Sequence, residues 1–154
     1  MLEDQDHYRA LEAMYAVAPI NRATEPKLEI SEGEARIRIA VKEELFHTAG
    51  ATHGSIYFKL LDDAAFFAVN SLEPDVFVLT TSFTTYITRP VSEGEMVAVG
   101  KVVNANKSQW IAEAVVYDGE GREIGRGNGV FVRSKIALSK MPGYKDYLGK
   151  IEGA

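Results

Sequence analysis

The chain contains no cysteine. That absence excludes disulfide bonds, thiolate metal sites and cysteine nucleophiles, so any catalytic group must be of another kind. Basic residues are also few, with 17 lysines and arginines against 22 acids and a formal net charge of -5. Because the phosphates of nucleic acids are bound by basic surfaces, we do not expect a nucleic acid as the main partner.

A long uninterrupted apolar run is missing as well. Lys59, Asp62 and Asp63 break the most apolar stretch, so we expect no membrane span. The first residues, MLEDQDHYRA, are acidic and lack the basic-then-apolar pattern of a secretory signal, which favours a cytoplasmic location. With 154 residues, of which 46% are apolar and 25% charged, the chain has the size and composition of one globular domain, which we expect to span 1–154.

Periodicity in the rest of the chain predicts two helices and six strands. Apolar side chains recur at helical spacing over 5–18, and Pro19 ends that run. A second helix is predicted over 53–70, where nearly every residue is apolar. Alternating or β-branched segments predict strands at 27–30, 35–41, 76–88, 96–103, 109–117 and 124–132. This order indicates an α+β fold, with a mostly meandering antiparallel sheet curled around the apolar helix.

The stretch 47–71, HTAGATHGSIYFKLLDDAAFFAVNS, carries the most chemistry. A carboxylate within so apolar a helix is costly to bury unless it is paired or used. Lys59 is placed to pair with Asp63 at i and i+4, which leaves Asp62 without a partner on the helix. Gly54 opens the helix, where free backbone N–H groups favour a negative charge. One segment therefore offers a candidate base and an anion site.

The spacing of Gly50, His53, Gly54 and Asp62 resembles the signature of the hotdog-fold acyl-CoA thioesterases, in particular the PaaI-like subfamily of the phenylacetic acid pathway. That signature reads Asn-x-x-Gly-x-x-His-Gly-Gly, with an Asp nine residues after the His. The family's Asn position holds His47 in this chain.

Features outside the signature extend the resemblance to about 35–135. Ser55 replaces the second glycine of the family, which is a mild departure because Gly54 is present. Downstream, the resemblance rests on Arg89-Pro90 at a strand end, Gly94-Glu95 at a strand start and an Asp-Gly turn at 118–119.

The resemblance implies a hotdog fold, in which a curved antiparallel sheet wraps around one long buried helix. We expect its core at about 27–135, with the helix at 5–18 as an N-terminal addition and 139–154 as a loosely docked extension. It also implies hydrolysis of an acyl-CoA to a carboxylic acid and free coenzyme A. Coenzyme A is then part of the substrate, and neither a cofactor nor a metal is required.

Two residues receive the central roles in this reaction. Asp62 is the expected base or nucleophile, and the Gly54 N–H is the expected donor to the oxyanion. Eight residues of one helix separate them by about 12 Å, so both can act on one thioester only if they come from different subunits. We therefore expect a homodimer, or a homotetramer built from two dimers, with shared sites as in the family.

Three further residues are candidates near the reacting bond. Thr80, ten residues before Pro90, matches a family position whose hydroxyl orients the attacking water, although ordinary strand propensity also explains a threonine there. His47 could donate to the thioester oxygen or hold the water. His53 could act there too, or only connect the loop to the helix. The spacing of both histidines and Asp62 fits no usual set of metal ligands.

Substrate contacts are predicted at two kinds of residue. Arg89, Lys107 and Arg133 are candidate partners for the phosphates of coenzyme A, or else are solvated charges. Tyr57, with the phenylalanines of the same helix, is a candidate wall of the acyl pocket, or else part of the core.

Two other functions stay open. The first is a non-catalytic hotdog module that binds acyl-CoA, and the replacement of the family's Asn by His47 is the reason to consider it. The second is a hotdog dehydratase or hydratase, whose catalytic pattern finds no convincing match in this chain.

Overall fold

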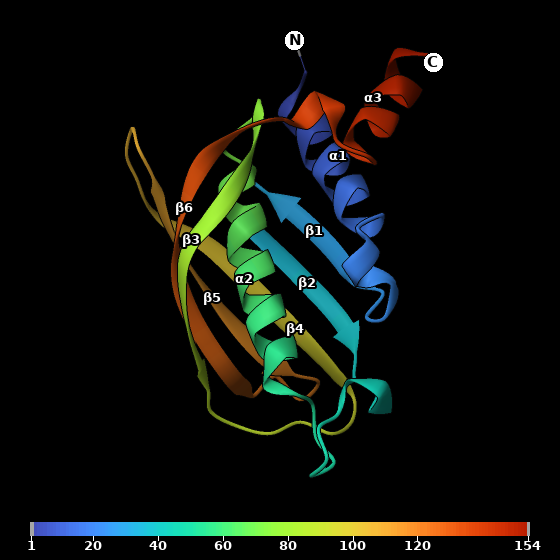
Figure 1. Ribbon diagram of the computed structural model, residues 1–154, viewed down its shortest axis with the longest axis vertical. Coiled ribbons are helices and arrows are strands. Elements are labelled where there is room, and N and C mark those ends of the chain that lie inside the picture. Colours follow the sequence, from blue (N-terminus) through green and yellow to red (C-terminus); the bar gives the residue numbers. More distant parts are fainter. Residues whose placement is uncertain (1, 154) are drawn as a thin grey trace.

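One antiparallel sheet curves around a single apolar helix (Figure 1). The computed structural model describes residues 2–153. Their elements are α1 (Asp4–Ala16), η1 (Pro19–Arg22), β1 (Lys27–Ser31), β2 (Glu34–Ala40), η2 (Glu43–Leu45), α2 (Gly54–Asn70), β3 (Val76–Ile87), β4 (Glu95–Ala105), β5 (Trp110–Asp118), β6 (Glu123–Ala137), η3 (Leu138–Lys140) and α3 (Tyr144–Glu152). The six strands are ordered β1-β2-β4-β5-β6-β3. The predicted α+β fold, with a curved sheet around α2 and an added N-terminal helix, is confirmed.

Small residues let α2 lie directly on the sheet. Ala64, Ala65 and Ala68 on the helix are fully buried. Opposite them, β4 carries Gly100, where an added Cβ would come within 2.3 Å of the Ala64 carbonyl group. One side of α2 is therefore packed on the sheet, and the side that faces away from the sheet is available for a functional site.

Replacing Gly100 by alanine is expected to lower the free energy of unfolding by about 3 kcal/mol, because α2 must move off the sheet to accept the methyl group. Gly149 of α3 is the matched control, since a Cβ added there meets no atom within 4 Å. Gly149→Ala should leave stability unchanged or raise it slightly. Urea unfolding of both variants measures the difference, and equal midpoints would contradict the close packing.

Strand β3 lies at one end of the sheet and pairs only with β6 among the described residues. Its other edge therefore presents unpaired backbone groups along 12 residues. Large apolar side chains are exposed on the same strand, namely Leu79, Tyr86 and Ile87. An edge of this length, with apolar residues beside it, is typical of a surface that pairs with another strand.

The C-terminal segment, predicted as a loosely docked extension over 139–154, forms η3 and α3 within the described residues, and it contacts α1. Strand β6 continues to Ala137, and α3 packs against α1 (Figure 1). Tyr144 is 2% exposed, and its hydroxyl lies 2.7 Å from Nδ1 of His7. The other ring nitrogen of His7 donates to the Asn70 carbonyl at 2.8 Å. Burial lowers the pKa of His7, so the ring is neutral and accepts the Tyr144 proton.

No helix among residues 2–153 is both long and apolar enough to cross a membrane.

Candidate active site

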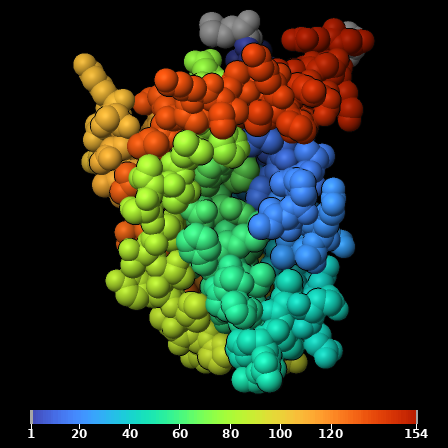
Figure 2. Space-filling model, in the orientation of Figure 1, coloured from blue at the N-terminus to red at the C-terminus, as the bar shows by residue number. Residues whose placement is uncertain are grey.

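A largely apolar groove of about 750 Å³ runs along α2, between the α1–η1 segment and the start of β3. In Figure 2 the green atoms of α2 are exposed between the yellow-green atoms of β3 and the blue atoms of the N-terminal segment. We call this groove along α2 the α2 groove. Much of its apolar lining comes from Phe58, Phe66, Phe77 and Leu79, and Ile20 of η1 lines it as well. Such a surface suits an apolar acyl group.

Asp62 lies on the wall of the α2 groove and accepts a hydrogen bond at 2.9 Å from the hydroxyl of Thr80 on β3. Burial raises the pKa of Asp62 to about 6, although the Thr80 hydrogen bond opposes that shift. The neighbouring Asp63 raises the pKa further and Lys59 lowers it. A carboxylate with a pKa in this range is ionised near neutral pH and is basic enough to accept a proton from water.

The expected ion pair on the helix is present. Lys59 Nζ lies 2.6 Å from Asp63 Oδ2, as the i and i+4 spacing predicted. Asp62 therefore has no such partner on α2, and its partner comes from β3 instead. The hydroxyl of Tyr15 on α1 also donates to Asp63, at 2.6 Å. Nothing in the sequence pairs Tyr15 with Asp63, because the helical spacing of Tyr15 gives no sign that its side chain reaches α2.

His53 has a structural role at the start of α2. It is the residue before the helix, and its Nδ1 accepts the backbone N–H of Ser55 at 3.1 Å. The Ser55 hydroxyl lies 2.8 Å from the same nitrogen. These contacts fit the alternative in which His53 connects the loop to the helix, because its Nδ1 caps α2 by accepting the Ser55 N–H.

A second pocket, of about 330 Å³, lies at the N-terminus of α2 and includes His47, Gly54, Tyr57 and Arg89. Gly54 is the first residue of α2, and its N–H donates to no group within residues 2–153. His47 accepts the N–H of Ala49 on its Nδ1 at 3.1 Å, so a neutral ring carries its proton on Nε2. Two residues that carry an N–H donor, Gly54 and His47, therefore line this pocket, and their role in catalysis stays a prediction.

Tyr57 belongs mainly to the core beneath this pocket. It is 1% exposed, and its hydroxyl donates to the backbone carbonyl of Arg89 at 2.8 Å. That bond ties α2 to the loop that follows β3. The structure thereby places the backbone of Arg89 beside the pocket, while a substrate-binding role for either side chain stays a prediction.

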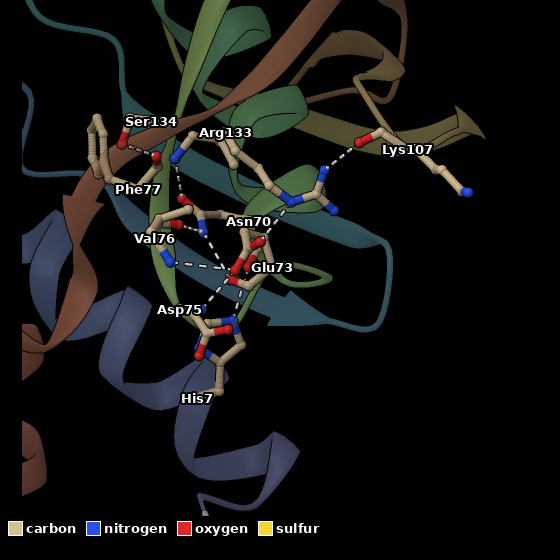
Figure 3. A network of polar contacts seen from close by, with 10 residues as sticks. His7, Asn70, Glu73, Asp75, Val76, Phe77, Lys107, Arg133 and Ser134 are labelled. Atoms are coloured by element: carbon tan, nitrogen blue, oxygen red, sulfur yellow. Dashed lines mark hydrogen bonds and ion pairs between the residues drawn. The ribbon is translucent and has the colours of Figure 1, made fainter.

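Arg133 is engaged within the protein (Figure 3). Its Nε donates to the buried Glu73 at 2.9 Å, and its Nη1 donates to the backbone carbonyl of Lys107 at 3.0 Å. Its guanidinium lies 4.2 Å from the centroid of the Trp110 ring. Within the described chain, neither Arg133 nor Lys107 lines the α2 groove or the pocket at its N-terminus. The exposed ammonium of Lys107 is the freer of the two candidate phosphate ligands.

The predicted residues thus fall into two sets. Asp62 and Thr80 meet on the α2 groove, whereas His47, Gly54 and Arg89 gather at the N-terminal pocket. The two sets lie about 12 Å apart along one continuous helix, so one chain cannot direct both at a single thioester. Within residues 2–153 no three His, Asp or Glu side chains gather as metal ligands, and the expected lack of a metal role stays a prediction.

Comparisons with known proteins point to a family of enzymes. Residues 49–124 match the model of the thioesterase superfamily. An esterase-named protein of Saccharolobus solfataricus is 23% identical over 104 residues, which cover 68% of this chain and 69% of that protein. An esterase-named protein of Sulfurisphaera tokodaii is 26% identical over 103 residues, covering 67% and 77%.

Solved structures agree with the fold. The Escherichia coli PaaI protein of the phenylacetic acid degradation operon superposes with a TM-score of 0.79 at 18% identity, covering 87% of this chain and 97% of that one. A mutant of the Thermus thermophilus PaaI protein gives a TM-score of 0.69 at 24% identity, covering 76% and 100%. These structures give the hotdog fold, and residues 49–124 supply the thioesterase match, so the chain is identified as a hotdog-fold thioesterase, a thioester hydrolase.

Proposed function

We propose that the protein is an acyl-CoA thioesterase in which Asp62 is the catalytic carboxylate. The observation that carries this proposal is the contact between Asp62 and Thr80 on the wall of an apolar groove. An apolar groove can hold an acyl chain, and a carboxylate whose pKa is raised to about 6 can act as a base at its edge. Alternatively, the same carboxylate attacks the carbonyl carbon directly as a nucleophile.

In the general-base reaction, Asp62 removes a proton from a water molecule as the water oxygen bonds to the carbonyl carbon. The Thr80 hydroxyl fixes the orientation of the carboxylate and lies close enough to help to place that water. The carbonyl oxygen becomes negative and accepts the N–H of Gly54, aided by the dipole of α2. When the C–S bond breaks, the sulfur leaves as a thiolate and takes the proton from Asp62. The products are a carboxylic acid and free coenzyme A, and the reaction requires neither a metal nor a cofactor.

The proposed site is shared by two subunits. Asp62 and Gly54 of one chain are too far apart, so Gly54 must act with Asp62 of the partner subunit. The unpaired edge of β3, with the exposed apolar residues beside it, supports a homodimer in which β3 pairs with its copy. A tetramer would be a dimer of such dimers. His47 then contributes its Nε2–H beside Gly54, and Arg89 and Lys107 are the proposed contacts to the phosphates of coenzyme A.

Thiol release from a panel of acyl-CoAs tests the proposal. Acetyl, hexanoyl, palmitoyl, benzoyl and phenylacetyl thioesters cover short, long and aromatic acyl groups. Turnover of any of them supports an acyl-CoA thioesterase and gives its preference. Binding without turnover would favour the acyl-CoA-binding module, and it would direct attention to His47 in place of the family's Asn.

Gly54→Pro is expected to lower kcat about 10²–10³-fold, because proline lacks the N–H that we assign to the oxyanion. The backbone suits this change, since proline is favoured at the first position of a helix and the preceding His53 is already extended, with φ -60° and ψ 141°. Gly54→Ala is the matched control. It introduces the same Cβ, 3.1 Å from the Ile87 side chain, but keeps the N–H. Equal kcat values for the two variants would contradict the assignment.

A further inference from the structure

Three side chains beside Asp62 form a closed network that connects α1 to α2. Lys59 Nζ and the Tyr15 hydroxyl both donate to Asp63 Oδ2, each at 2.6 Å. The ammonium also donates to the Tyr15 oxygen at 3.1 Å and lies 5.0 Å from the centroid of that ring. The side chains of Lys59 and Asp63 are only 14% and 21% exposed, so solvent screens this network weakly. We call these three residues the Tyr15 network.

The Tyr15 network borders the proposed catalytic carboxylate. Lys59 lies three residues before Asp62, which puts the two on the same side of α2, and both line the α2 groove. Lys59 and Asp63 are the charged groups that act on Asp62, and the uncharged hydroxyls of Tyr15 and Thr80 approach from α1 and β3. A cation favours an ionised carboxylate and an anion disfavours it, so the two charges have opposite effects on Asp62.

We propose that Lys59, held in place by Asp63 and Tyr15, is a positioning residue that keeps Asp62 ionised for catalysis. This inference rests on the proposed role of Asp62. A lysine side chain is long and strongly hydrated, and without anchors its ammonium would move into solvent, where its effect on a neighbour is small. Asp63 and Tyr15 supply the anchors. The N-terminal helix therefore contributes to the chemistry of the site through the Tyr15 hydroxyl.

The pH dependence of kcat/KM tests this role. In the wild type, kcat/KM should fall as the pH drops below about 6, where Asp62 becomes protonated. In Lys59→Met that fall should begin at higher pH, because the favourable cation is gone. In Asp63→Asn it should begin at lower pH, because the anion that disfavours ionisation of Asp62 is gone while the Tyr15 oxygen still accepts from Lys59. The double variant should return close to the wild type. A purely structural role would not produce shifts of opposite sign.

Tyr15→Phe provides a milder variant in case Lys59→Met does not fold. It keeps the aromatic ring, which packs 4.9 Å from Phe67 between centroids, and removes only the hydroxyl. Asp63 then loses a donor and Lys59 loses an anchor. The acid limb of the pH profile, which is the fall of kcat/KM at low pH, should move to higher pH by less than in Lys59→Met.

Controls use cross-strand neighbours on the outer face of the sheet. Lys101→Met and Glu113→Gln make the same changes of net charge at exposed positions and should leave the acid limb unchanged. Acid limbs that coincide with the wild type in the folded Lys59 and Asp63 variants, or that move in one direction, would overturn the inference. Failure of the proposed function gives a different result, since Asp62→Asn would then remain active.

Discussion

Asp62→Asn is expected to lower kcat for thioester hydrolysis by at least about 10²–10⁴-fold, the usual contribution of a positioned base. Asparagine has the same shape but cannot take a proton from water or attack a carbonyl carbon. Its amide oxygen can still accept the Thr80 hydroxyl, so the local contact survives. A neutral amide also avoids the cost of burying a charge. We therefore expect a folded variant with its thermal midpoint unchanged or raised, and with acyl-CoA binding retained.

Two measurements separate the loss of chemistry from the loss of binding. Thiol release under saturating acyl-CoA gives kcat, and isothermal titration of a slowly hydrolysed acyl-CoA gives Kd. Asp75→Asn is the control, since it makes the same chemical change at an exposed position before β3. If Asp62→Asn retained kcat within a factor of about three, catalysis would reside elsewhere. The groove would then be a binding site only.

Local pattern was sufficient to predict the parts of the molecule where neighbours in sequence decide the structure. The apolar run over 53–70 gave α2, and the i and i+4 spacing gave the pair of Lys59 and Asp63. The position of Thr80 beside Asp62 came from the resemblance rather than from periodicity, because contacts between a helix and a strand 18 residues away leave no local signal.

Contacts between distant segments account for what the sequence did not reveal. Helix α3 docks through Tyr144 and His7, which lie 137 residues apart, so neither residue identifies the other in the sequence. Arg133 was a candidate phosphate ligand because of its charge and its place near a strand end, with a solvated charge as the alternative. Its buried partner Glu73 lies 60 residues away, and only the fold brings the two together.

Co-assembly of two inactive variants is expected to restore activity. In a dimer of Asp62→Asn with Gly54→Pro, one shared site contains both defects, and the other contains an intact Asp62 and an intact Gly54 from opposite subunits. A purified heterodimer should have about half the wild-type kcat per dimer, and a randomly mixed 1:1 population about a quarter. Two affinity tags, one on each variant, allow the heterodimer to be isolated after co-expression.

The heterodimer distinguishes a shared site from one built within a single chain. If Asp62 and Gly54 of the same subunit acted together, each subunit of the heterodimer would contain one defect and the mixture would stay inactive. Tagged wild-type dimers show whether the tags or the assembly reduce kcat. A monomer that hydrolyses acyl-CoA, identified by light scattering, would likewise contradict the shared site. Recovery of activity requires that the helix N-terminus of one subunit reach the carboxylate of the other. The separation of Gly54 and Asp62 along α2, about 12 Å over eight residues, demands such an arrangement.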